Sequence, residues 1–112
     1  MSCSHRAIRT AFVMVSICAC AAALAQAPAP FARGEPPQGK ILAERDCVAC
    51  HARRFDGDGD RMYLRPDHRV RTAQQLLAQV SYCNAQLGTQ YFPDDEEHVA
   101  AYLNERYYHF KP

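Results

Sequence analysis

The chain has 112 residues, with 13 Lys or Arg, 12 Asp or Glu and six Cys. A chain of this length forms one domain, which excludes a multidomain enzyme. The nearly balanced charge gives no sign of a nucleic-acid-binding protein, because such proteins depend on a marked positive charge.

The first 25 residues have the pattern of a secretory signal peptide. Arg6 and Arg9 form a basic start, an apolar run extends from Ala11 to Ala23, and Ala23-Leu24-Ala25 is typical of a cleavage site. The apolar run is short for a transmembrane span, so we expect no such span in the mature chain. Export to the periplasm is therefore predicted, with residues 1–25 removed. The cysteines that remain are Cys47, Cys50 and Cys83.

A second interpretation of the leader is a lipoprotein signal. The segment Ile17-Cys18-Ala19-Cys20 loosely resembles a lipoprotein processing site, in which Cys20 would carry the lipid. A lipid-anchored form of the exported protein is thus an alternative.

Residues 26–38 are rich in Ala, Pro and Gln, which predicts an extended tether before a folded domain over residues 39–112.

The folded domain opens with a short helix and a long loop. The apolar spacing that leads up to the first remaining cysteines predicts a helix over about Gly39–Cys50. Residues 52–71 contain Gly57, Gly59 and Pro66, and we expect them to be irregular.

Two further helices are predicted. Thr72 begins the first, whose apolar stripe includes Leu76 and Val80, and Gly88 ends it. Pro93 begins the second, where Asp94 and Glu97 resemble a capping box and Val99, Tyr102 and Leu103 mark one face. No strand-like alternation is long enough to predict a sheet. The expected fold class is all-α, with three main helices and a long loop.

Three short helices bury too little apolar surface for a stable core, and the remaining cysteines allow at most one disulfide. The segment Cys47-Val48-Ala49-Cys50-His51 offers a solution, since Cys-x-x-Cys-His is the attachment signature for c-type haem. Two thiols at this spacing reach the two vinyl groups of one porphyrin, and the next residue supplies the axial nitrogen of the iron. The predicted cofactor is one covalently attached haem, which would also fill the core.

Three other interpretations of this motif remain open. A thioredoxin-like redox pair needs a βαβ context, which the sequence does not show. A zinc site would use Cys47, Cys50, His51 and Cys83. A simple Cys47–Cys50 disulfide is also possible in an exported chain.

The segment from Gly39 to His51 resembles the opening of the small class I cytochromes c. The resemblance implies that the helix containing Gly39 crosses the last helix, and that the carbonyl of a downstream proline, here Pro66, accepts a hydrogen bond from His51 Nδ1. It also implies a periplasmic carrier of single electrons rather than an enzyme, with membrane-bound or soluble redox partners. Cys47 and Cys50 would tether the haem, and His51 would be the proximal iron ligand.

The sixth iron ligand is left open by the sequence. Met62 is the one methionine after the predicted cleavage, but it lies much closer to His51 than the ligand methionine of class I cytochromes. The segment Val80–Gly88 resembles the high-spin cytochromes c with an asparagine ligand. This resemblance makes Asn84, or the nearby Tyr82, a candidate for the sixth ligand. The alternative role for Asn84 is a helix-terminal hydrogen bond. Other candidates are His68, His98 and His109. An open sixth position would instead indicate a haem protein that binds a small diatomic ligand, as sensor or scavenger.

Charged residues crowd the loop after the attachment motif. The arginines would pair with haem propionates, attract an acidic redox partner or be solvated. They are Arg53, Arg54, Arg61, Arg65, Arg69 and Arg71. The segment Asp56–Asp60 resembles part of a calcium loop, but Arg61 stands where that loop needs glycine, so a flexible acidic turn is the simpler interpretation.

Overall fold

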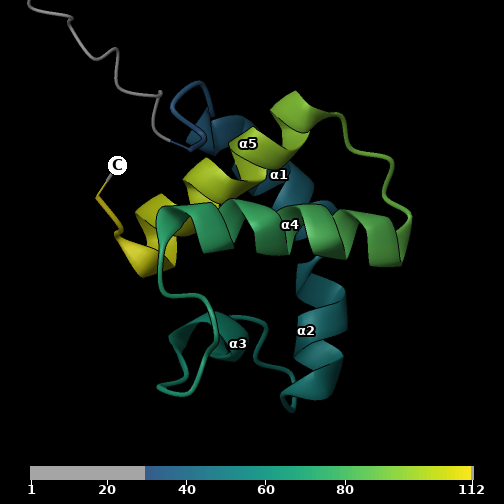
Figure 1. Ribbon diagram of the computed structural model, residues 1–112. Coiled ribbons are helices and arrows are strands. Elements are labelled where there is room, and N and C mark those ends of the chain that lie inside the picture. Colours follow the sequence, from purple (N-terminus) through teal and green to yellow (C-terminus); the bar gives the residue numbers. More distant parts are fainter. Residues whose placement is uncertain (1–29, 112) are drawn as a thin grey trace, which may run out of the picture.

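The computed structural model describes residues 30–111, and within this range every regular element is helical (Figure 1). The predicted all-α class is therefore confirmed for the described residues. The predicted signal peptide, the alternative lipid site at Cys20 and residues 26–29 lie outside them. The elements are α1 (Pro36–Asp46), α2 (Val48–Arg54), α3 (Arg61–Leu64), α4 (Ala73–Leu87), α5 (Pro93–Leu103) and a final π-helical turn, η1 (Asn104–Tyr108).

Helices α1 and α5 cross with their backbones in contact, and this is the most extensive helix contact in the described fold. A Cβ atom added to Gly39 would lie 1.8 Å from the carbonyl oxygen of His98, and one added to Gly34 would lie 2.3 Å from that of Glu97. Only glycine permits so close an approach. The crossing of the Gly39 helix with the last helix agrees with the prediction.

The folded region begins earlier than predicted. Helix α1 starts at Pro36, because a proline in the first turn of a helix loses no hydrogen bond. Residues 30–35 pack along α5, where Arg33 Nη2 lies 2.9 Å from Glu97 Oε1 and the Glu35 amide donates to His98 Nδ1 at 2.9 Å. Residues 30–38 are thus part of the domain and not a tether.

The predicted helix over Gly39–Cys50 is two helices. Cys47, with φ −107° and ψ −45°, separates α1 from α2, which continues to Arg54. The loop that we expected to be irregular over residues 52–71 also contains the end of α2 and the short helix α3. Periodicity could not locate these features, since the break is one residue long and α3 is a single turn.

The boundaries of α4 were predicted correctly. The Thr72 hydroxyl accepts a hydrogen bond from the Gln75 amide at 3.1 Å, and Gly88 ends the helix with φ 65°. Helix α5 begins at Pro93 as predicted, but the acidic side chain that caps it is Asp95, which accepts from the Phe92 amide at 3.0 Å. The predicted Asp94–Glu97 capping box is wrong because the cap is two residues earlier than expected, at Phe92 with Asp95.

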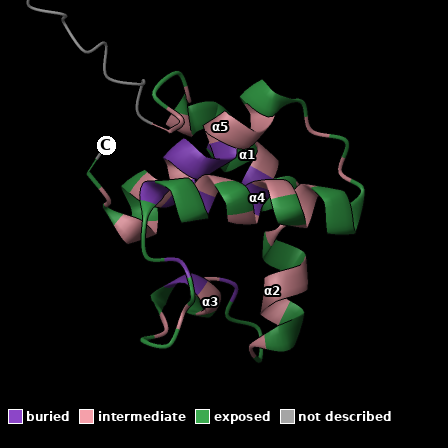
Figure 2. Ribbon diagram, viewed as in Figure 1, coloured by how far each residue is buried: buried purple, intermediate pink, exposed green. Residues whose placement is uncertain are grey.

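The core lies where α1, α4 and α5 meet, and Figure 2 shows that the helices below α4 contribute little to it. None of the residues of α2 is buried, and α3 buries only Tyr63. No helix in the range 30–111 is both long enough and apolar enough to span a bilayer. The buried apolar residues are Ala43, Tyr63, Val70, Ala73, Leu76, Val80, Val99, Ala100, Ala101 and Leu103.

Candidate functional site

A cavity of about 640 Å³ lies against the attachment motif, and Cys47, Cys50 and His51 all line it. Side chains of the core, among them Leu76 and Val99, form apolar parts of its wall. A volume of this size is within the range of cofactor-binding sites, which combine apolar walls with a few placed polar groups. The described fold therefore encloses a space of cofactor size next to the predicted attachment residues.

The break between α1 and α2 positions the three attachment residues. Cys47 ends one helix, while Cys50 and His51 lie in the first turns of the next. The His51 amide donates to the Cys47 carbonyl at 3.2 Å, so the motif turns back on itself in a helical conformation. As a result, two thiols and one imidazole face a common cavity.

The thiol of Cys47 is held protonated by its surroundings. Burial raises its pKa to about 11, and the neighbouring Cys83, Asp46 and Cys50 add to the effect. All three described cysteines are free thiols, so the alternative of a Cys47–Cys50 disulfide is not the state of this structure. Next to the motif, Asp46 accepts hydrogen bonds from the Tyr91 hydroxyl at 2.6 Å and from Arg45 Nη2 at 2.6 Å. These bonds fix the end of α1.

The imidazole of His51 is neutral and partly buried. Its pKa lies below the ordinary value because burial, and then the charge of Arg54, disfavours the protonated ring. The ring packs edge-on against Tyr63, with centroids 5.2 Å apart, and its Nδ1 is buried without a hydrogen-bond partner. A neutral imidazole is the form of histidine that ligates a metal.

The structure does not form the predicted hydrogen bond between His51 and Pro66. The Pro66 carbonyl lies 3.4 Å from Arg71 Nη2 and accepts a hydrogen bond from it. Pro66 itself is exposed, in a turn that the His68 amide closes by donating to the Arg65 carbonyl at 3.3 Å. The predicted role of Pro66 is therefore wrong in this structure, because its turn faces solvent.

Asn84 does not present a free atom to the cavity. Its amide oxygen accepts from the Thr89 hydroxyl at 2.7 Å and from the Tyr91 amide at 3.0 Å. Its amide nitrogen donates to Glu96 Oε1 at 2.7 Å and to the Tyr91 carbonyl at 3.1 Å. Both lone pairs of the oxygen are used. Asn84 lines the cavity but joins α4 to the start of α5, so the structure gives it the alternative role of a helix-terminal hydrogen-bonding residue.

Two of the other histidines, His98 and His109, do not line the cavity. His98 Nδ1 accepts the hydrogen bond from Glu35, and His109 is exposed at the end of η1. Tyr82 is 60% exposed and reaches only the edge of the cavity. The remaining candidates that line the cavity are Met62 on α3, His68 between α3 and α4, and Cys83 on α4. Cys83 is half-buried rather than part of the core, and its sulfur accepts from Gln79 Nε2 at 3.3 Å.

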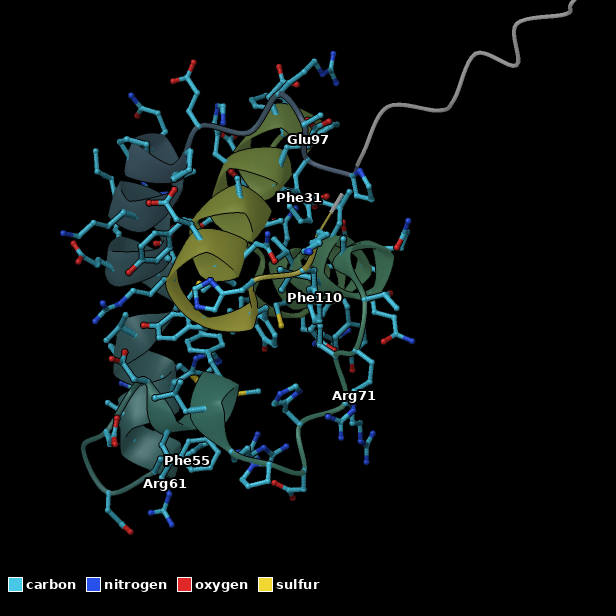
Figure 3. The ribbon with its side chains drawn as sticks, turned by 90° about the vertical axis from the view of Figure 1, so that its left-hand side faces the viewer. Phe31, Phe55, Arg61, Arg71, Glu97 and Phe110 are labelled. Atoms are coloured by element: carbon cyan, nitrogen blue, oxygen red, sulfur yellow. The ribbon has the colours of Figure 1, made fainter. Side chains whose placement is uncertain are left out.

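The arginines after the motif divide into two groups. Arg54, Arg65 and Arg69 line the cavity, whereas Arg61 and Arg71 point away from the helices in Figure 3. The Nε atom of Arg65 is buried without a hydrogen-bond partner, although it lies 3.7 Å from Asp67 Oδ1. The cavity wall therefore carries three positively charged side chains.

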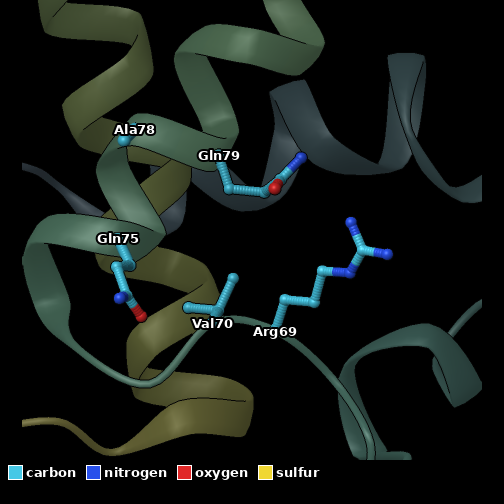
Figure 4. Close-up of a pocket in the computed structure, with 5 residues that line it drawn as sticks. All are labelled: Arg69, Val70, Gln75, Ala78 and Gln79. Atoms are coloured by element: carbon cyan, nitrogen blue, oxygen red, sulfur yellow. The ribbon is translucent and has the colours of Figure 1, made fainter.

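A second, smaller hollow of about 230 Å³ lies against α4 (Figure 4). It shares Arg69, Val70 and Gln79 with the large cavity, and its other lining residues are Gln75 and Ala78. Gln75 Oε1 accepts the Arg71 amide at 2.7 Å, so this side chain closes the loop before α4. The hollow is the outer side of the same wall and not a separate site.

The described residues form neither the zinc nor the calcium alternative. Within residues 30–111, no group of three or more His, Cys, Asp or Glu side chains is placed to hold a metal ion. In the acidic turn, Asp58 Oδ1 accepts from the amides of Asp60 and Arg61, at 3.0 and 3.2 Å. Asp60 accepts from the Tyr107 hydroxyl at 2.7 Å. These carboxylates stabilise the turn.

No protein-family model, curated protein or solved structure matches this chain. Its own residues therefore have to indicate what it does.

Proposed function

We propose that the chain is an exported, monohaem cytochrome c that carries single electrons and is not an enzyme. The observation that supports this most is the cavity of about 640 Å³, with both thiols of the Cys-x-x-Cys-His motif and the neutral His51 imidazole on its wall. Cys47 and Cys50 would hold the haem as thioethers, and His51 would supply the proximal axial nitrogen.

The residues present fit a haem in three respects. The cavity is of cofactor size and has apolar walls. No hydrogen bond engages the buried Nδ1 of His51, so no protein contact at that atom competes with iron for the ring. The helices below α4 bury only Tyr63, so a large apolar group would supply the core that they lack. When bound, the haem supplies one-electron exchange between its ferric and ferrous states.

The arginines on the cavity wall suit the two carboxylates of a haem. Arg54, Arg65 and Arg69 line it, and a buried, unpartnered donor such as Arg65 Nε costs roughly 1–3 kcal/mol until an acceptor is supplied. A charge-assisted bond to a propionate would satisfy that donor. The exposed Arg53, Arg61 and Arg71 would then attract an acidic redox partner, either membrane-bound or soluble.

The helix arrangement supports the finer proposal of a class I cytochrome c fold. In that family the helix before the attachment site crosses the last helix at a glycine. Here α1 crosses α5 at Gly39, where the helices lie too close together for any side chain. The leader over residues 1–25 supports the proposed periplasmic location, because c-type haem is attached after export in bacteria.

A potentiometric titration of the protein matured in the periplasm of a bacterium that attaches c-type haem tests this function. We expect the visible spectrum to change reversibly between ferric and ferrous forms with a slope of one electron. A haem that is attached but cannot be reduced and reoxidised reversibly would contradict the proposed role as an electron carrier.

A further inference from the structure

We infer that His68 is the second axial ligand of the haem iron, an inference that rests on the proposed function. His68 lines the same cavity as His51, and its buried Nδ1 has no hydrogen-bond partner in the described structure. The proposed site therefore holds the iron between His51 and His68.

The two histidines reach the cavity from different segments of the chain. His51 belongs to α2, which follows α1 and lies below α4 in Figure 1. His68 belongs to the segment that joins α3 to the start of α4, which Figure 1 shows apart from α2. Both residues line the cavity, so two separate segments each bring one imidazole to it.

The environment of His68 leaves one of its ring nitrogens without a hydrogen-bond partner. Its Nδ1 is buried without a hydrogen-bond partner. Of the histidines within residues 30–111, only His51 has the same property. The ring packs edge-on against Tyr108, with centroids 5.3 Å apart, so aromatic packing orients it. A buried polar nitrogen without a partner costs free energy, which coordination of a metal would offset.

The competing side chains have other contacts or weaker donors. Asn84 uses both lone pairs of its oxygen in hydrogen bonds, and the sulfur of Cys83 already accepts from Gln79. Met62 has a soft, apolar side chain that fills space without any polar group to satisfy. Imidazole is a good ligand for iron, and it leaves no open position for a diatomic molecule.

The test compares the matured wild type with His68→Ala, and uses Met62→Leu, Cys83→Ser and His109→Ala as matched controls. Haem content is measured first in denatured protein as the pyridine complex, which reports covalent attachment independently of the axial ligands. Electron paramagnetic resonance and near-infrared magnetic circular dichroism then identify the ligands, and carbon monoxide probes the ferrous form.

For the wild type we expect a low-spin ferric signal of two nitrogen ligands, with no uptake of carbon monoxide. His68→Ala should retain its haem, become high-spin and take up one carbon monoxide per haem, and added imidazole should restore the low-spin signal. The three controls should keep the wild-type spectra.

Three results would overturn the inference. A sulfur–iron charge-transfer band in the wild type would assign the position to Met62 or Cys83, and the corresponding control would lose it. A high-spin wild type that binds carbon monoxide would show an open site and favour a diatomic-ligand protein. Low-spin spectra that His68→Ala leaves unchanged would exclude His68. If His68→Ala fails to mature, the wild-type spectra alone decide. A wild type with no covalent haem would instead overturn the proposed function, and this inference with it.

Discussion

The two halves of this domain are packed in different ways. Where α1 crosses α5, the backbones touch at Gly39 and the side chains Ala43, Val99 and Ala100 are almost completely buried. Around the cavity, α2 buries none of its residues, and nitrogen atoms of His51, Arg65 and His68 are buried without partners. Native proteins leave few buried polar atoms unsatisfied, so three in one place need an explanation.

The difference indicates which half can fold by itself. The crossing of α1 and α5 is complete with protein atoms alone, since each helix fills the groove of the other. The cavity half has apolar walls together with polar atoms that lack partners. We expect this half to depend on the proposed haem for its stability, and the crossing not to.

Removal of both attachment thiols should produce the largest effect. In the Cys47→Ala/Cys50→Ala protein, we expect no covalent haem, and faster amide hydrogen exchange in α2 and α3 than in the α1–α5 crossing. Hydrogen exchange followed by mass spectrometry measures both halves in one experiment. Cys83→Ala is the matched control and should keep its haem. Equal protection of both halves without haem would contradict the difference between them.

Gly39→Val tests the other half. A Cβ atom at this position would lie 1.8 Å from the His98 carbonyl oxygen, so the helices must separate, at a cost of about 3 kcal/mol or more in the free energy of unfolding. Chemical denaturation of the haem-bound protein measures the loss.

Gly57→Ala is the control for Gly39→Val. A side chain at Gly57 meets no atom within 4 Å, but φ is +92°, so the cost should be only about 1–2 kcal/mol. A smaller loss for Gly39→Val than for Gly57→Ala would show that the crossing is not tightly closed.

Asn84→Ala separates a structural residue from an iron ligand. The change removes four hydrogen bonds from the end of α4, three to the loop residues Thr89 and Tyr91 and one to Glu96 on α5, and should lower the free energy of unfolding by about 2 kcal/mol. The ferric and ferrous spectra should not change. A shift in spin state would mean that Asn84 does bind the iron.

Asp46→Asn should have the smallest effect, and one that depends on pH. The hydrogen bonds from Arg45 and then Tyr91 lower the pKa of Asp46 below its ordinary value of 3.8. The carboxylate therefore stabilises the folded chain at pH values above 3.8, and this contribution disappears as the pH falls below the folded-state pKa.

The wild type should thus exceed Asp46→Asn in stability by less than about 1 kcal/mol at neutral pH, with no excess in strong acid. Thermal unfolding of both proteins across this pH range measures the difference. A difference that grows toward acid would contradict the assigned sign.

The sequence predicts the larger features of the fold because their signals are local. Thr72, Gly88 and Pro93 mark helix ends by their own chemistry, and Gly39 has no side chain where two helices must touch. Features that depend on neighbours were missed. Nothing local shows that residues 30–38 pack along α5, or that the helix breaks at Cys47.

In the candidate site, too, the residues of a local motif were predicted and the contacts between distant residues were not. Cys47, Cys50 and His51 follow from one short motif, and the structure places all three on one cavity wall. The roles of Pro66 and Asn84 were carried over from a resemblance, and both depend on contacts with distant residues. The Pro66 carbonyl accepts a hydrogen bond from Arg71, and the Asn84 oxygen accepts from Thr89 and Tyr91. His68 could not be selected from sequence, since only the fold shows that it lines the same cavity as His51 with its Nδ1 buried and unpartnered.

The central claim is that Cys47 and Cys50 hold a haem covalently. It is tested most directly by the intact mass of the exported protein after unfolding in acid and organic solvent, conditions that release any haem held by contacts alone. We predict a mass equal to that of the processed chain plus one haem, and a visible spectrum that stays with the protein. A colourless chain with the mass of the polypeptide alone, from cells that mature a control cytochrome c, would contradict the claim.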